Sequence, residues 1–216
     1  MKEKILIVAI AGAGKTFLAE NYKNVVDFEY LYHLWDYDES IKDLPIDMHK
    51  GNPNRTPNPD YPWNFIVDIK HELEKDKIVV IPGMPNGIYA VMVGKDYFDK
   101  DTRIIFAMPS EDDFESLAER YRKRGNPESF VELVRVNFAK AHELAKNFKG
   151  AEYLIIPPKK YLADALIEYG IKLEPGVGVV KENRNAGREF ESEYKEQMRK
   201  NQKYKIDIVT STLIEL

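Results

Sequence analysis

Hydrophobic and polar residues form blocks along the chain that predict an α/β fold. Short apolar runs, of the length of buried strands, alternate with longer stretches in which apolar residues recur every three or four positions, as in helices. The runs are residues 5–8, 25–26, 78–81, 103–107 and 151–156, and the helical stretches are about 17–23, 63–75, 87–97, 110–125, 129–148 and 161–167. Strands that alternate with helices form a parallel sheet with helices on both faces, so we expect a three-layer fold.

The first apolar run ends in a glycine-rich loop with the sequence of a phosphate-binding loop. Residues 9–16 (AIAGAGKT) lie between a buried strand and a helix, the context that such a loop requires. Glycines let consecutive backbone N–H groups face one anion. Lys15 is expected to reach the outer phosphates of a nucleotide, and the Thr16 hydroxyl is expected to bind Mg²⁺. The expected nucleotide-binding residues are Ala11, Gly12, Ala13, Gly14, Lys15, Thr16 and Phe17.

This loop departs from the usual pattern at one position. The pattern G-x-x-x-x-G-K-[ST] begins with glycine, where this chain has Ala9. Alanine is the smallest possible departure, and the part that wraps the phosphates is kept. The alternative interpretation is a glycine-rich turn with an exposed lysine.

Two carboxylates follow the second apolar run. Asp27 and Glu29 are two residues apart, so on extended backbone their side chains point the same way. They end a strand, and ligands bind at that edge of open α/β sheets. The third run ends in Pro82-Gly83 and has no carboxylate, so we expect Asp27 and Glu29 to be catalytic and Asp27 to share a metal with Thr16. The alternative is a pair of solvated loop acids.

The helix after the fourth run carries a local concentration of positive charge. Arg120, Arg122, Lys123 and Arg124 are four cations in five residues, in a chain of net charge −4. Arg120 and Arg124 are four residues apart and share one face of a helix. We expect residues 110–148 to form a lid in which these two arginines are catalytic, closing over ATP and excluding water. The alternative is the general preference for cations in the last turn of a helix.

Two segments lie outside the alternation of strands and helices. Residues 31–62 contain too much proline for one long helix, and their aromatic content predicts a packed, substrate-facing insertion. Its candidate substrate-binding residues are Arg55, Asn58 and Asp60, although Asn58 and Asp60 also suit a turn and a helix cap. Residues 174–216 are mostly charged and polar, with a helix expected at about 188–202 and a strand at 206–209. We expect this segment to affect stability or self-association and not the choice of substrate.

Composition narrows the classes of function. A net charge of −4 gives no general attraction for nucleic acid, which would need a local basic patch. No apolar run approaches the roughly 20 residues that span a bilayer, and the N-terminal apolar run leads into the glycine-rich loop, unlike a signal peptide. The absence of cysteine excludes disulfides and cysteine-bound zinc and suits a reducing compartment. We therefore expect a cytoplasmic protein without membrane contact.

The order of these motifs resembles that of the small P-loop kinases of bacteriophages, described as nucleoside monophosphate kinase-like or adenylate kinase-like proteins. The matching segments are Gly12-x-Gly14-Lys15-Thr16, Val25-Val26-Asp27, residues 58–62 and residues 119–126. The resemblance covers about residues 1–160 and implies the fold of P-loop NTPases, with a five-stranded parallel core and a lid. It also implies that Lys15 and its loop bind ATP and that Arg120 and Arg124 contact phosphates. The kinase domain would then span residues 1–173, with an extension at 174–216, in the host cytoplasm if a phage encodes the protein.

Together these features predict Mg²⁺-ATP-dependent phosphoryl transfer to a nucleotide or nucleoside-like acceptor. The γ-phosphoryl group spreads charge over its oxygens as it moves, so cations surround it while a carboxylate positions the acceptor hydroxyl or its metal. Two alternatives stay open. One is a kinase that acts on a hydroxyl in DNA or RNA, and the other is a nucleotide-binding or hydrolysing module whose lid and tail bind a protein. The sequence identifies neither the acceptor nor the oligomeric state.

Overall fold

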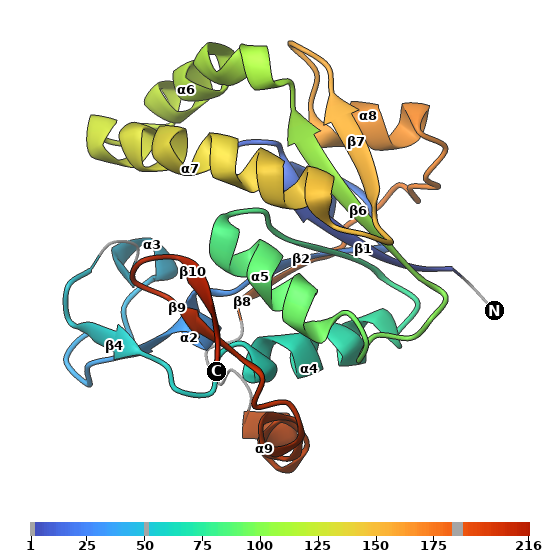
Figure 1. Ribbon diagram of the computed structural model, residues 1–216. Coiled ribbons are helices and arrows are strands. Elements are labelled where there is room, and N and C mark those ends of the chain that lie inside the picture. Colours follow the sequence, from blue (N-terminus) through green and yellow to red (C-terminus); the bar gives the residue numbers. More distant parts are fainter. Residues whose placement is uncertain (1–2, 50–51, 183–187) are drawn as a thin grey trace.

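A six-stranded parallel sheet forms the centre of the molecule (Figure 1). The computed structural model describes residues 3–49, 52–182 and 188–216. The strand order across the sheet is β7-β6-β1-β5-β2-β8, and every neighbouring pair is parallel. The strands are β1 (Lys4–Ala9), β2 (Val25–Glu29), β5 (Ile78–Pro82), β6 (Thr102–Pro109), β7 (Glu152–Ile156) and β8 (Val179–Glu182).

Five of these strands coincide with the five predicted apolar runs, and the sixth comes from the C-terminal extension. β8 lies beside β2, with Asp27 opposite Val180 and Glu29 opposite Glu182. The two adjacent valines there, at positions 179 and 180, lie between a Pro-Gly break and a charged segment, outside the alternation of strands and helices that marks the other runs. The sheet therefore has one strand more than predicted, and the extension takes part in the core fold.

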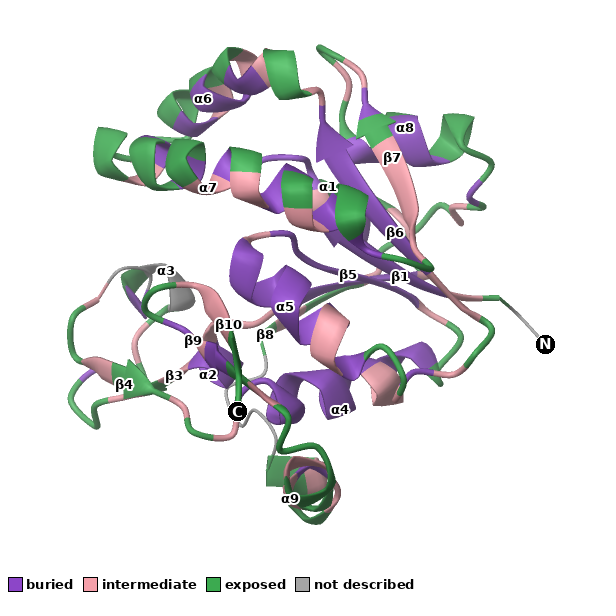
Figure 2. Ribbon diagram, viewed as in Figure 1, coloured by how far each residue is buried: buried purple, intermediate pink, exposed green. Residues whose placement is uncertain are grey.

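The central strands are buried on both faces. Every residue of β5 is buried, as is every residue of β1 after Lys4 (Figure 2). Helices cover both sides of a parallel sheet, which is why its strands are continuous apolar runs without alternation. This burial holds the loops at the carboxyl edge of the sheet in fixed positions.

Helices cover the two faces of the sheet in the arrangement that was expected. The helices α4, α5 and α7 pack side by side on one face, and α1 and α8 lie on the other (Figure 1). The helices are α1 (Lys15–Asn21), α2 (Leu31–Leu34), α3 (Ile46–His49), α4 (Trp63–Leu73), α5 (Pro85–Gly94), α6 (Phe114–Lys123), α7 (Glu128–Asn147), α8 (Leu162–Glu168) and α9 (Glu191–Lys200). Within the described residues, no helix is both long enough and apolar enough to span a membrane.

The predicted lid is a pair of packed helices. α6 and α7 follow β6 and are joined by a short turn at Gly125. Phe114 of α6 packs edge-on against Phe138 of α7, and Tyr121 packs in the same way against Phe130. These contacts make residues 114–147 one unit.

The insertion at residues 31–62 is packed around its own aromatic cluster. β3 (Trp35–Tyr37) and β4 (Arg55–Pro57) form an antiparallel pair. His49 lies between two tyrosines: its ring stacks on Tyr37 with centroids 4.5 Å apart, and its Nδ1 bonds the hydroxyl of Tyr32 at 2.7 Å. The prediction of a packed segment agrees with this structure.

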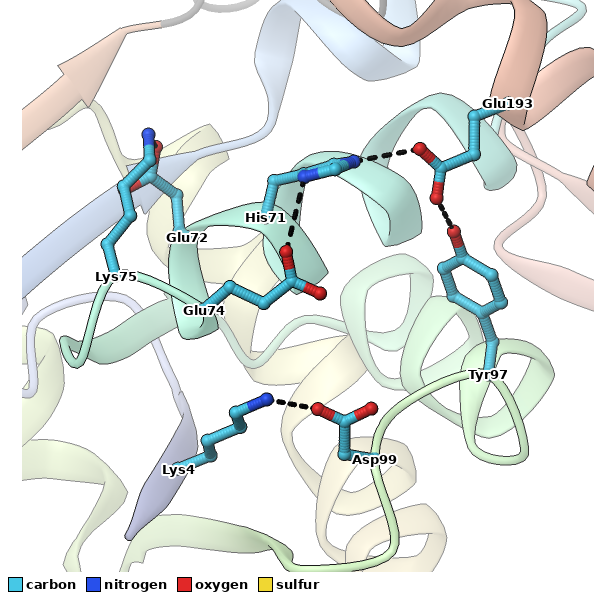
Figure 3. Close-up of polar contacts among 8 residues, drawn as sticks. All are labelled: Lys4, His71, Glu72, Glu74, Lys75, Tyr97, Asp99 and Glu193. Atoms are coloured by element: carbon cyan, nitrogen blue, oxygen red, sulfur yellow. Dashed lines mark hydrogen bonds and ion pairs between the residues drawn. The ribbon is translucent and has the colours of Figure 1, made fainter. Parts of the chain in front are cut away.

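The C-terminal extension docks on the α/β core through α4 (Figure 3). His71 of α4 contacts Glu193 of α9, with Nε2 and Oε2 2.8 Å apart, and its ring stacks on Phe190 at 3.7 Å. Tyr97 donates a hydrogen bond to the same glutamate. The chain then ends in a hairpin, β9 (Tyr204–Asp207) and β10 (Thr212–Glu215), which packs against α5. The predicted helix is present, and the predicted late strand is one arm of this hairpin.

Candidate active site

The phosphate loop between β1 and α1 requires glycine at two positions. Gly12 and Gly14 have φ angles of +76° and +106°, in the left-handed region that other residues rarely adopt. A Cβ atom on Gly12 would lie 2.6 Å from Cε1 of Tyr121. Lys15 bends back over the loop, with Nζ 3.4 Å from the carbonyl oxygen of Ile10. The strand, loop and helix follow one another as the sequence predicts.

The two residues predicted to hold a metal are in direct contact. The hydroxyl of Thr16, in the first turn of α1, donates a hydrogen bond of 2.9 Å to Oδ2 of Asp27 in the middle of β2. Asp27 is buried, with 7% of its surface exposed. Magnesium favours oxygen ligands and commonly uses one or two carboxylates together with phosphate oxygens and water. A hydroxyl and a carboxylate beside a phosphate loop fit that requirement.

Glu29 lies on the same face of β2, two residues further along the strand. Two residues of strand correspond to about 6.6 Å, so the two carboxylates share the carboxyl edge of the sheet. The Glu29 carboxylate accepts a hydrogen bond of 2.8 Å from the backbone N–H of Tyr30. Burial, together with the nearby Glu29 charge, raises the pKa of Tyr30. Among the described residues, no group of three or more His, Cys, Asp and Glu side chains is arranged to hold a metal ion.

One of the two lid arginines lies at the phosphate loop. Arg120 donates a hydrogen bond of 3.0 Å to the carbonyl oxygen of Lys160, and its guanidinium lies 4.2 Å from the ring centroid of Tyr161. Tyr161 is next to Gly14, because a Cβ atom there would lie 3.3 Å from the tyrosine ring. Arg124, one turn further along α6, is exposed, and among the described residues its side chain has no hydrogen-bond or ion-pair partner. The sequence predicts the same role for both arginines, but in the structure only Arg120 contacts residues beside the phosphate loop.

Tyr121 attaches the lid helix to the phosphate loop, and the sequence reasoning missed it. Its hydroxyl donates a hydrogen bond of 2.6 Å to the carbonyl oxygen of Ala11. The side chain is 1% exposed, and burial raises the pKa of its phenol. In the sequence it has only the helical spacing of a core residue. This hydrogen bond attaches α6 directly to the glycine-rich loop.

The three candidate substrate residues of the insertion have structural partners. The guanidinium of Arg55 lies 4.1 Å from the ring centroid of Trp35. Asn58 makes a turn in which its side-chain oxygen accepts from the N–H of Asp60 at 2.9 Å. Asp60 accepts a hydrogen bond of 3.0 Å from the hydroxyl of Tyr194 on α9. Asn58 and Asp60 thus fill the turn and anchoring positions, and a role of these three residues in substrate binding stays a prediction.

The segment after β5 lies between the phosphate loop and the acidic residues, because β5 lies between β1 and β2. Gly83 donates a backbone hydrogen bond of 2.8 Å to Ala9, and a Cβ atom there would lie 2.9 Å from the Ala9 carbonyl carbon. Asn86, in the first turn of α5, donates a side-chain hydrogen bond of 3.1 Å to the carbonyl oxygen of Ile208. Its own carbonyl accepts one of 2.7 Å from the Tyr61 hydroxyl. The sequence does not predict the Asn86 contacts, because they join residues that are far apart in the chain.

A buried histidine–aspartate pair joins α2 of the insertion to α4, with His33 on α2 and Asp68 on α4. Nε2 of His33 is 2.8 Å from Oδ2 of Asp68, and the two side chains are 0% and 1% exposed. The His33 ring packs against Phe28 and Phe65. Burial lowers the pKa of His33 and outweighs the opposing effect of Asp68. The pair is inaccessible to a substrate and contributes to stability.

Comparison with solved structures finds proteins that resemble this chain at low sequence identity. No protein-family model matches it. No curated protein matches it either. The tunicamycin resistance protein of Deinococcus radiodurans is 17% identical, with a TM-score of 0.45 over 81% of this chain and 99% of that one. A gluconokinase from Sinorhizobium meliloti 1021 is 16% identical, with a TM-score of 0.43 over 77% and 89%. An uncharacterized protein from Eubacterium ventriosum ATCC 27560 is 14% identical, with a TM-score of 0.38 over 79% and 98%. Because these similarities are remote, we base the function on the geometry of the site.

Proposed function

We propose that the protein transfers the γ-phosphoryl group of Mg²⁺-ATP to a hydroxyl of a nucleotide or nucleoside-like acceptor. The observation that carries this proposal is the 2.9 Å hydrogen bond from Thr16 to Asp27. It joins the hydroxyl of a phosphate-binding loop to a buried carboxylate at the carboxyl edge of the sheet. A hydroxyl and an acid in this position are the protein ligands that a magnesium ion uses in P-loop enzymes.

The nucleotide would lie along the loop. The backbone N–H groups of residues 12–16 would face its phosphates, and Lys15 would neutralise the outer ones. Thr16 and Asp27 would hold Mg²⁺, which when bound neutralises charge on the β- and γ-phosphate oxygens. The pair of Arg120 and Tyr161 beside Gly14 offers a cation and an aromatic ring on which a purine base can stack.

The acceptor would approach from the edge that carries Glu29. A carboxylate there can accept the proton of the acceptor hydroxyl as the phosphoryl group arrives. Arg124 is exposed on the lid, so closure of α6 and α7 would bring a cation to the reacting phosphates. Closure would also exclude water, which otherwise competes with the acceptor.

The tail gives little support to a nucleic-acid acceptor. Three of its lysines have acidic partners: Lys195 with Asp60, Lys200 with Glu196 and Lys203 with Glu215. Paired cations contribute little to a patch that attracts a polyanion. We therefore prefer a small acceptor to DNA or RNA.

A screen of acceptors tests this proposal. ADP formation from ATP is measured with nucleosides, nucleoside monophosphates and oligonucleotides, each at about 50 and about 200 mM salt. We expect one of the two small classes to stimulate ADP formation, with only a shallow dependence on salt. Stimulation by oligonucleotides alone, falling steeply with salt, would instead support the nucleic-acid kinase. A rate unaffected by every acceptor would support a hydrolysing module.

A further inference from the structure

The C-terminal hairpin ends on the segment at the centre of the candidate site. This segment follows β5 and lies between the phosphate loop and Asp27. The backbone N–H of Gly83 donates a hydrogen bond to the carbonyl oxygen of Ala9, where the phosphate loop begins, and the side chain of Asn86 donates one to the carbonyl oxygen of Ile208 in the hairpin. Gly83 and Asn86 are three residues apart, so at most about 11 Å of chain separates the two contacts. The hairpin therefore lies close to the phosphate loop.

The turn of the hairpin also reaches the lid. Nζ of Lys140 on α7 donates a hydrogen bond of 2.6 Å to the carbonyl oxygen of Ser211. The hairpin thus joins the first turn of α5 to the middle of α7. Residues 85–91 of α5 are buried without interruption (Figure 2). A helix buried all round is covered by protein on every side. Here α5 contacts α4, α7 and both strands of the hairpin.

The insertion at residues 31–62 also contacts Asn86, the residue that bonds the hairpin. The hydroxyl of Tyr61 donates to the backbone carbonyl of Asn86 at 2.7 Å. Burial, and then the nearby Tyr30, raise the pKa of the Tyr61 phenol. Next to this contact, Asp60 of the insertion is held by Tyr194 of α9. The insertion, α5 and the C-terminal extension therefore meet at Asn86.

The hairpin is held by buried apolar side chains and by its own turn. Ile206 and Ile208 belong to the hydrophobic core. Within the turn, Oδ1 of Asp207 accepts hydrogen bonds of 3.0 and 3.1 Å from the N–H groups of Val209 and Thr210. Asn86, beneath the hairpin, is 8% exposed. These contacts give the hairpin a fixed place on α5.

We propose that the β9–β10 hairpin forms a wall on the acceptor side of the candidate active site and limits the acceptor to a small molecule. This inference rests on the proposed function. A polymer acceptor continues on both sides of the hydroxyl that reacts, so it needs a path that is open at both ends. The hairpin closes one end, between α5 and α7, and the insertion closes the adjoining position at Tyr61. A molecule of nucleoside or nucleotide size needs only one open side.

A unique thiol tests the wall without any need for catalysis. The chain has no cysteine, so Met84→Cys places the only thiol between the loop contact and the hairpin contact. The reaction of this variant with N-ethylmaleimide is compared with that of a polyethylene-glycol maleimide, each relative to free cysteine. We expect the large reagent to lag behind the small one by about tenfold or more, since it needs a local opening of the hairpin. Equal relative rates would overturn the proposal.

A loosened hairpin provides the matched comparison. Both comparisons are made in the Met84→Cys chain. The double change Ile206→Ser and Ile208→Ser removes two buried apolar side chains, whereas the control Ile214→Ser alters the same hairpin at an exposed position. We expect the lag to shrink several-fold in the double variant and to persist in the control, and an unchanged lag in the double variant would contradict the wall. If circular dichroism shows that the double variant is unfolded, the proposal is judged by the Met84→Cys chain alone, in which equal relative rates of the two reagents would overturn it. Because labelling is independent of turnover, a failure of the proposed kinase activity is recognised separately, by the acceptor screen.

Discussion

The hydroxyl of Thr16 donates a hydrogen bond of 2.9 Å to the carboxylate of Asp27. Thr16 belongs to the helix after the phosphate loop, and Asp27 lies in β2, the strand two positions away from β1 in the sheet. This contact ties the loop to the carboxyl edge of β2, so that both can act on one nucleotide.

Replacement of Asp27 by asparagine tests the acidic site. Asp27→Asn keeps the size of the side chain and removes its charge, so we expect the rate of phosphoryl transfer to fall by about 10²-fold or more. Steady-state kinetics over a range of Mg²⁺ concentrations measure the effect. The exposed Asp101→Asn is the matched control and is expected to behave like the wild type. A near-normal rate for Asp27→Asn would show that this carboxylate has no part in the reaction.

Two glycines with similar backbone angles separate conformational strain from a steric clash. Gly12 and Gly125 have φ angles of +76° and +79°, so alanine costs about 1–2 kcal/mol at either position. At Gly12 the new methyl group would also meet the Tyr121 ring at 2.6 Å, whereas at Gly125 nothing lies within 4 Å. Overpacking adds about 1–3 kcal/mol, so Gly12→Ala is expected to lose clearly more free energy of unfolding. Urea denaturation measures both, and equal losses would contradict the packing of Tyr121 on the loop.

The two lid arginines are expected to affect different kinetic constants. Arg124 is exposed, and we propose that it reaches the phosphates only when the lid closes, so Arg124→Ala should lower kcat by about 10²-fold or more with little change in the KM for ATP. Arg120 already lies against Tyr161 beside the loop, so Arg120→Ala should raise the KM for ATP by about two- to fivefold. Lys123→Ala is the control for loss of charge on the same helix. A drop in thermal stability alone, without a kinetic effect, would assign the arginines to the end of the helix.

The stability of the protein is expected to fall as the pH drops from about 7 to about 5. Burial lowers the pKa of His33 and that of His142. Below about 6.5 the unfolded chain therefore binds protons that the folded chain does not bind, which favours unfolding. Each histidine contributes a slope of at most about 1.4 kcal/mol per pH unit. Urea denaturation of the wild type and of His33→Gln at several pH values measures this slope.

The variant His33→Gln retains a polar group beside Asp68 but does not titrate. We expect its free energy of unfolding to depend on pH about half as strongly as that of the wild type between pH 7 and 5, because His142 still contributes. Above about pH 7 both proteins should show little dependence. An identical slope in the two proteins below pH 6.5 would mean that His33 is already protonated in the folded state.

The core of the fold and the phosphate loop were predictable from the sequence because their signals are local. β1 and β5 are continuous apolar runs, since helices cover both faces of the sheet. Gly12, Gly14, Lys15 and Thr16 follow β1 directly in the chain. The pairing of Thr16 with Asp27 followed from the rule that the ends of parallel strands meet at one edge.

The rest depends on contacts between distant parts of the chain. Asn86 and Ile208 are separated by 122 positions, and neither residue shows in the sequence that the other is its partner. Tyr121 has the spacing of a core residue, and only the structure shows its hydroxyl on the phosphate loop. β8 is recognisable as a strand only beside β2, because its two valines follow a Pro-Gly break and no helix of the alternating pattern follows them. The strand that the extension adds to the sheet was therefore not predicted.

The fate of the γ-phosphate is the most direct test of the account. The protein is incubated with ATP labelled in its γ-phosphate and with the acceptor selected by the screen, and the label is measured in the acceptor and in inorganic phosphate. We predict that most of the label enters the acceptor, that Lys15→Ala abolishes this transfer, and that the exposed Lys100→Ala leaves it unchanged. Label found only in inorganic phosphate, at a rate that the acceptor does not alter, would contradict a kinase. Transfer that persists in Lys15→Ala would contradict the phosphate-loop site itself.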